Sequence, residues 1–287
     1  MTAPRNGSST GLPNPYPVEL TPPDITPYAK GTGSIPYIWT FDSGLPGPHV
    51  ALTAIVHGNE PCGALTLDWL MKRDTRPIVG KLSFAFMNVA AHEAFDPDLP
   101  DASRWIDEDF NRLWAKETLD DPDRPMTEEL RRAREVRPWL DSVDLLLDIH
   151  SMQNKNAALT IAGLLPKGRD LARSVGYPPL VINDQGHAEG LRMRDYGGFG
   201  DPTSARNAML VECGQHWEKS AEGAAMETAI RFLRATGAVA EDFGADWMAT
   251  RPAPDAMQFF QVSRAVTIET DEFRFSQDWK GQIGRAS

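Results

Sequence analysis

The sequence places a histidine and a glutamate three positions apart, in His57-Gly58-Asn59-Glu60-Pro61, directly after a short apolar run. An imidazole and a carboxylate at this spacing can reach one metal ion from a single turn of the chain, and Gly58 lets the backbone turn tightly. The same residues suit the solvent-facing start of a helix, with Pro61 at its first position. This motif alone therefore leaves metal binding and helix capping open.

A second histidine, His150, favours the metal interpretation. It follows the largely apolar residues 143–149, in an Asp-Ile-His-Ser motif. If two strands bring His57, Glu60 and His150 to the same sheet edge, they supply two nitrogens and one carboxylate, which is a ligand set of catalytic zinc with one position open for water. Asp148 lies two residues back on the same strand face. There it could hold an imidazole tautomer or face water.

Arg104, Asn111 and Arg112 lie in a loop-like stretch between expected elements. A guanidinium group is suited to forked recognition of a carboxylate or a developing oxyanion. The same stretch also contains Asp107, Glu108 and Asp109, and taken alone it is better explained by ordinary surface ion pairs with these residues.

Glu212 ends the apolar residues 208–211, at what should be the same sheet edge. A carboxylate there could take a proton from water and pass it to a leaving amine, or it could be an exposed strand-end residue. His216 follows four positions later. It could contact substrate or cap the next helix, and we favour the cap.

These residues need a sheet to bring them together. Apolar runs typical of buried strands occur at residues 35–41, 49–56, 82–88, 143–149, 157–162 and 208–211. Helical patterns occur at 62–71, 128–140, 168–175 and 218–236. The alternation predicts an α/β fold with a largely parallel sheet.

Three segments are predicted along the chain. Residues 1–34 are rich in Pro, Gly, Ser and Thr and are expected to form an extended N-terminal arm. Residues 35–243 hold the alternating elements and every candidate residue, and are expected to form the catalytic domain. Residues 244–287 are expected to form a small β-rich segment, with short strands at 259–270 and 272–275.

Composition limits the partners. The 287 residues include 40 acidic and 29 basic side chains, for a net charge of −11. This charge argues against nucleic acid and against an anionic membrane surface. No long apolar run or signal peptide is evident, so a cytoplasmic protein is expected. Cys62 and Cys213 are expected to be buried free thiols. Whether the protein forms a homo-oligomer stays open.

The motifs, taken together and in this order, resemble the succinylglutamate desuccinylase/aspartoacylase family, a branch of the zinc carboxypeptidase superfamily. The resemblance rests on residues 57–60, Arg104, residues 111–112, residues 148–150 and residues 211–214, and it runs from about residue 35 to residue 240. It implies a zinc-carboxypeptidase-like fold, with a mostly parallel or mixed central sheet flanked by helices and a small β-rich C-terminal segment. It also implies that His57, Glu60 and His150 hold one zinc ion per chain.

The remaining roles follow from the same resemblance. Glu212 corresponds to the general acid/base, and Arg104 to the arginine that polarises the scissile carbonyl together with the metal. Asn111 and Arg112 correspond to a pair that grips a substrate carboxylate. Family members often use a further arginine for specificity. The candidates in the Gly-rich stretch 186–206 are Arg192, Arg194, Tyr196 and Arg206, of which Arg194 is expected to contact the substrate. The β-rich segment ends sooner than in the family, which implies a truncated lobe.

The implied activity is zinc-dependent removal of the acyl group from a small N-acylated amino acid or related amine that bears a carboxylate. Two alternatives stay open. A zinc carboxypeptidase would use the same residues on peptide C-termini, and a catalytically inert binding protein could share the scaffold.

Overall fold

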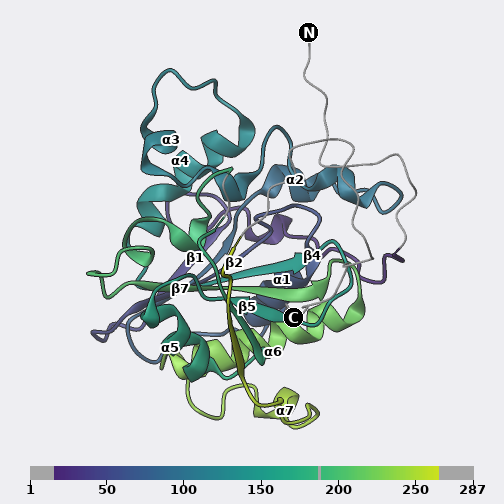
Figure 1. The fold of residues 1–287 in the computed structure, drawn as a ribbon, viewed down its shortest axis with the longest axis vertical. Coiled ribbons are helices and arrows are strands. Elements are labelled where there is room, and N and C mark those ends of the chain that lie inside the picture. Colours follow the sequence, from purple (N-terminus) through teal and green to yellow (C-terminus); the bar gives the residue numbers. More distant parts are fainter. Residues whose placement is uncertain (1–15, 187–188, 265–287) are drawn as a thin grey trace.

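The computed structural model describes residues 16–186 and 189–264. Within these residues a single mixed sheet of eight strands has the order β1-β3-β2-β4-β7-β5-β6-β8 (Figure 1). The strands are β1 Ile38–Asp42, β2 His49–Ala54, β3 Lys81–Phe86, β4 Leu145–Met152, β5 Leu159–Ile161, β6 Leu180–Asn183, β7 Asn207–Gln215 and β8 Gln258–Gln261. The α/β fold with a mixed sheet is confirmed.

The direction of the strands reverses between β7 and β5. Strands β3, β2, β4 and β7 run parallel to one another. Strand β5 is antiparallel to β7, and β5, β6 and β8 again run parallel. At the other edge β1 is antiparallel to β3. Every position of β2 is buried, as expected for a parallel strand covered on both faces.

Helices cover both faces of the sheet (Figure 1). Helices α1, α5 and α6 share one apolar core with the sheet, and α4 packs into a second core on the opposite face. The helices are α1 Pro61–Lys72, α2 Val89–Glu93, α3 Lys116–Asp120, α4 Glu128–Leu140, α5 Pro166–Val175, α6 Lys219–Ala235 and α7 Ala245–Met248. None of the described helices is both long and apolar enough to cross a membrane.

The described part of the expected N-terminal arm packs against the domain. The N–H groups of Glu19 and Leu20 donate to the carbonyl oxygen of Trp217, and the Tyr28 ring stacks on Phe86 with centroids 5.3 Å apart. Near the other end, β8 supplies one short strand of the expected β-rich segment. The division into three segments stays a prediction. Residues 1–15 and 265–287, including the strand expected at 272–275, lie outside the described residues.

Candidate metal and catalytic site

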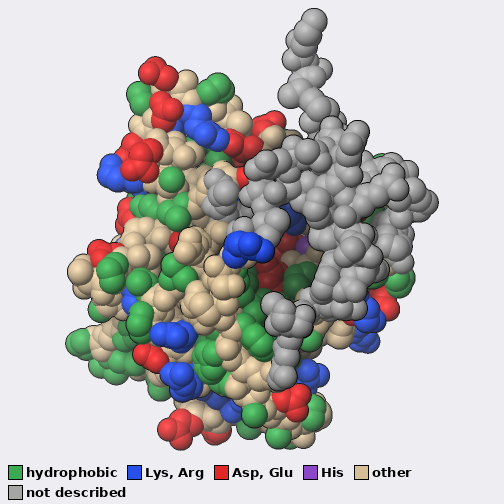
Figure 2. All heavy atoms as spheres, viewed as in Figure 1, with side chains coloured by type: hydrophobic (Ala, Val, Ile, Leu, Met, Phe, Trp, Pro, Cys, Tyr) green, Lys and Arg blue, Asp and Glu red, His purple; other side chains and the backbone are tan. Residues whose placement is uncertain are grey.

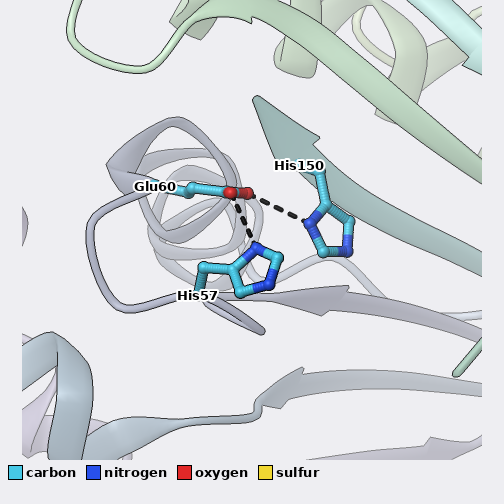
Figure 3. A group of neighbouring side chains, drawn as sticks. All are labelled: His57, Glu60 and His150. Atoms are coloured by element: carbon cyan, nitrogen blue, oxygen red, sulfur yellow. Dashed lines mark hydrogen bonds and ion pairs between the residues drawn. The ribbon is translucent and has the colours of Figure 1, made fainter. Parts of the chain in front are cut away.

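Three candidate metal ligands meet where β2 and β4 lie side by side. His57 lies in the turn after β2, Glu60 precedes α1, and His150 lies in β4. All three side chains are buried, and one ligand atom from each lies within 4.8 Å of the others. Figure 3 shows the Glu60 carboxylate pointing at both imidazole rings. The sequence prediction that these residues come together is therefore matched by the geometry.

Both rings are turned the same way. The Nδ1 atoms of His57 and His150 lie 2.8 and 3.1 Å from the Glu60 carboxylate oxygens. The Nε2 atom of His57 lies 2.9 Å from Asp109, and that of His150 lies 2.9 Å from Asp148. An outer carboxylate of this kind orients a metal-binding histidine and raises its basicity. For Asp148 the sequence left open an imidazole contact or exposure to water, and the structure has the contact; the contact of Asp109 was not predicted.

The turn that carries His57 and Glu60 is fixed by close packing. A Cβ atom on Gly58 would lie 2.3 Å from the carbonyl carbon of Ala91, so only glycine fits without a backbone shift. Pro61 opens α1 as expected, but Glu60 makes no side-chain capping hydrogen bond. Its Oε2 accepts instead from the Ser151 N–H at 3.0 Å. The helix-capping alternative for Glu60 is therefore wrong.

The charges in this cluster favour a bound cation. Burial opposes ionisation of Glu60, yet His57 and His150 lower the pKa of its carboxyl well below the usual range. Burial also disfavours the charged form of His150, but the carboxylates of Asp148 and Glu60 raise its pKa above the ordinary value. Two imidazoles and one ionised carboxylate thus lie together, with two further carboxylates behind the rings.

Glu212 and Arg104 reach the same cluster. Glu212 pairs with His150 in the register of β7 and β4. Burial raises the pKa of its carboxyl to about 8, and its Oε2 atom has no hydrogen-bond partner. Arg104 places Nη1 3.4 Å from Glu60 Oε1 and Nη2 3.2 Å from His57 Nε2. Glu212 is thus not an exposed strand-end residue, and Arg104 is not an ordinary surface cation.

A cavity of about 520 Å³ opens over the cluster, a size typical of small-molecule sites. Figure 2 shows a hollow of this face where acidic, basic and histidine side chains gather. The cavity is lined by charged, imidazole, hydroxyl and amide side chains together with Trp105 and Met152, namely Asn59, Asp101, Arg104, Trp105, Asp109, Ser151, Met152, Gln153, Asn154, Asn156, Glu212 and His216.

The expected carboxylate-gripping pair lies behind this lining. Asn111 is buried, and its Oδ1 accepts from the Met193 N–H at 2.8 Å. Arg112 has Nη2 3.7 Å from Asp109 Oδ2, and its buried Nε has no hydrogen-bond partner. Neither Asn111 nor Arg112 is among the described residues that line the 520 Å³ cavity.

Arg194 lies elsewhere. Its Nη2 donates to the carbonyl oxygens of Ala162 and Ala208 at 3.1 and 2.7 Å, and its side chain lines a separate cavity of about 220 Å³. Because β5 runs antiparallel to β7, these carbonyls lie toward the opposite end of β7 from Glu212. The guanidinium ties β5 to β7, and its contacts do not bring it to the cavity that holds Glu212.

His216 was assigned to the wrong role. Helix α6 begins after Glu218 without a side-chain cap, so the expected cap by His216 is absent. The ring is instead buried against the cavity, with Nδ1 2.8 Å from Ser151 Oγ.

Cys62 and Cys213 are buried free thiols, as expected.

A family model described as the succinylglutamate desuccinylase/aspartoacylase catalytic domain matches residues 46–200. This region holds His57, Glu60, Arg104 and His150 and covers more than half of the chain. The chain belongs to the succinylglutamate desuccinylase/aspartoacylase family. Glu212 lies beyond the region that the family model matches. No curated protein matches the chain.

Several solved structures share the family fold. Succinylglutamate desuccinylase from Vibrio cholerae is 17% identical, with a TM-score of 0.58, over 85% of this chain and 71% of that one. The product-bound ectoine utilization protein EutE (DoeB) from Ruegeria pomeroyi is 16% identical, with a TM-score of 0.52, over 75% of this chain. The chain spans 62% of the Ruegeria protein and 60% of a Rhodobacter sphaeroides member of the family. At such identities the likeness shows the fold alone.

Proposed function

We propose that this protein is a zinc-dependent hydrolase that removes the acyl group from a small N-acylated amino acid or related amine. The observation that carries the proposal is the convergence of His57, Glu60 and His150 with Glu212, whose pKa is raised to about 8, on one cavity. Membership in a family described by desuccinylase and aspartoacylase activity supports hydrolysis of an amide.

The residues present fit a zinc ion. Two imidazole nitrogens and one carboxylate oxygen form a three-ligand set that leaves room for water, and each ring has an outer carboxylate. The Oε2 atom of Glu212 is buried and has no hydrogen-bond partner. This fits a site in which a bound water or substrate contacts the Glu212 carboxyl. When bound, zinc supplies Lewis-acid chemistry, because it lowers the pKa of water and polarises a carbonyl.

Glu212 is the proposed proton carrier. It accepts a proton from the attacking water and returns it to the departing nitrogen, so that the amide yields a carboxylic acid and a free amine. A carboxyl with a pKa near the working pH can perform both transfers, and burial provides this shift.

Arg104 is the proposed donor to the carbonyl oxygen. Its guanidinium is fixed beside Glu60 and lies 5.4 Å from the centroid of the Trp105 ring. A donor held in this way stabilises the oxygen as negative charge develops on it. Arg112, whose Nε has no hydrogen-bond partner and lies 4.0 Å from Glu189 Oε2, is proposed to bind the substrate carboxylate, with Asn111 as the second member of the pair. Because neither side chain lines the 520 Å³ cavity, this role requires Arg112 to turn toward the bound substrate.

The test is release of free amine from N-acetyl, N-succinyl and N-formyl amino acids and from short peptides by zinc-loaded protein. One acyl class should be hydrolysed, and Glu212→Gln should lower kcat by about 10²–10⁴-fold with the zinc content unchanged. Glu241→Gln, at an exposed position, is the matched control.

The alternatives predict different outcomes. Peptide hydrolysis at least as fast as that of the N-acyl amino acids would favour a carboxypeptidase. A protein that neither retains zinc nor acquires activity after zinc addition would be an inert binding protein. Bound zinc without turnover of any substrate in the panel would contradict the proposed deacylation of these compounds.

A further inference from the structure

His216 and Ser151 form a hydrogen-bonded pair on the cavity wall that the proposed mechanism does not use. Ser151 follows His150 in β4, and His216 directly follows β7. The His216 Nδ1 atom lies 2.8 Å from Ser151 Oγ and 4.0 Å from Glu60 Oε1. Only 1% of His216 is exposed, yet both side chains line the cavity.

An irregularity in the sheet brings His216 to this wall. The register pairs His150 with Glu212 but Met152 with Gln215, so β7 has one residue more than β4 in this interval. Gly214 takes a φ of 111°, which favours glycine. Such an insertion redirects the side chains that follow it, and insertions of this kind are common beside active sites.

The ring is then held from several sides. The His216 N–H donates to the carbonyl oxygen of Met152 at 2.9 Å, and the ring centroid lies 5.5 Å from that of Trp217. The Trp217 indole in turn donates to the carbonyl oxygen of Asn59 at 3.1 Å. His216 is therefore pre-organised in a fixed orientation.

Which ring nitrogen of His216 carries the proton depends on which group donates in the hydrogen bond between Nδ1 and Ser151 Oγ. Among the described residues, His216 Nδ1 is the one recorded side-chain partner of the Ser151 hydroxyl, and a hydroxyl that donates to Nδ1 leaves the ring proton on Nε2. Glu60 Oε1 is already within hydrogen-bond distance of His57 Nδ1 and Arg104 Nη1. A neutral imidazole that accepts at Nδ1 has its proton on Nε2 and is a hydrogen-bond donor there.

We infer that His216 is a second donor to the scissile carbonyl oxygen, acting from Nε2 beside Arg104, and that Ser151 is the positioning residue that fixes its tautomer. The two side chains lie close together, since Arg104 Nη1 lies 3.4 Å and His216 Nδ1 lies 4.0 Å from the same atom, Glu60 Oε1, and both side chains line the cavity. This inference rests on the proposed function. It gives the substrate carbonyl a neutral donor as well as a cationic one.

The kinetic test compares zinc-loaded wild type with His216→Phe and His216→Gln on the substrate that the panel identifies. His216→Phe should lower kcat by about 10²–10³-fold while KM changes little, because an oxyanion donor acts in the transition state. His216→Gln should recover most of this loss, because its side-chain amide can place a donor near the position of Nε2. Equal losses in both variants, or an unchanged kcat in His216→Phe, would overturn the inference.

Ser151→Ala tests the positioning role separately. The backbone N–H that binds Glu60 stays in place in this variant, so the zinc content should stay at the wild-type level. Its kcat should fall, but by less than that of His216→Phe. Ser174→Ala removes a hydroxyl that bonds a carbonyl within α5 and is the matched control. A wild-type kcat in Ser151→Ala would refute the positioning role.

The tautomer can be measured without turnover. Nitrogen-15 NMR of histidine-labelled, zinc-loaded protein, with His216→Gln used for assignment, should show Nε2 protonated and Nδ1 unprotonated. Protonation at Nδ1 would overturn the inference. Failure of the proposed function and failure of the role of His216 give different results. A wild type inactive on the whole panel contradicts the proposed function, whereas an active wild type with an unaffected His216→Phe variant contradicts only the role of His216.

Discussion

Each histidine of the candidate metal site is held through both of its ring nitrogens. One nitrogen faces Glu60, and the other faces a carboxylate, which is Asp109 for His57 and Asp148 for His150. These outer contacts restrict each ring to one orientation before a metal arrives. The geometry therefore assigns the two aspartates to metal affinity more than to substrate.

We expect Asp109→Asn and Asp148→Asn each to weaken zinc binding by about 10–100-fold, because an amide holds the imidazole less strongly and does not raise its basicity. Competition with a chromophoric chelator measures the affinity. Asp123→Asn, at an exposed position, should bind zinc like the wild type. If both variants retained wild-type affinity, the outer carboxylates would have no role in holding the metal.

The sequence could predict the residues that follow strands, but not those placed by tertiary packing. His57, His150 and Glu212 were found because apolar runs end beside them. Asp109 was missed because its contact with His57 spans 52 positions and crosses a loop. His216 was misassigned because the extra residue in β7 alters which side chains reach the cavity, and no periodic pattern reveals such an insertion.

Helix α4 positions the loop that contains Arg104 and Asp109. The carboxylate of Glu129, fully buried in α4, accepts from the N–H groups of Ile106, Asp107 and Glu108 at 2.7, 3.0 and 3.3 Å. It also accepts from the side-chain amide of Asn88 at 3.1 Å. One buried charge therefore fixes a loop that has little regular structure of its own.

Replacing this charge should affect stability and catalysis together. Glu129→Gln should lower the free energy of unfolding by about 1–3 kcal/mol, because charge-assisted hydrogen bonds to a buried group are lost. Urea denaturation at a fixed metal content measures the change, and kcat should fall as Arg104 loses its support. The exposed Glu117→Gln should differ from wild type by less than about 0.5 kcal/mol. An unaltered urea midpoint in Glu129→Gln would refute the anchoring role.

Some helices and strands could be predicted from the sequence, and others could not. Helix α4 spans the expected 128–140, since Thr127 caps it by accepting from the Leu130 N–H and acidic residues open its first turn. Strand β6, with four residues, was not predicted, because so short a segment has little pattern. The antiparallel pairing of β5 with β7 was also not foreseen, since pairing direction depends on how distant segments meet.

At the scale of the whole molecule, the enclosed carboxyl group of Glu212 should make stability depend on pH in the metal-free protein. Burial raises its pKa from the ordinary 4.5 to about 8. Between these values the folded protein binds more protons than the unfolded chain, so the stabilisation present below pH 4.5 is lost as the pH rises toward 8.

Glu212→Gln should therefore be more stable than wild type near pH 8 in the presence of a chelator, by an amount that shrinks toward pH 4.5. Urea denaturation over this pH range measures the difference, and Glu241→Gln should follow the wild-type curve. A stability difference that does not vary with pH would contradict the raised pKa.

The candidate metal ligands come from distant parts of the chain. Glu60 and Ser151, which are joined by a hydrogen bond, are 91 positions apart, so the site forms only after β2, β4 and β7 have paired. Closing such long intervals is slow and costs chain entropy. An ion that binds only the completed sheet adds its binding free energy to folding. When the metal is scarce, a larger fraction of newly made chains would stay unfolded and open to proteolysis, so metal supply would set the amount of this protein as well as its activity.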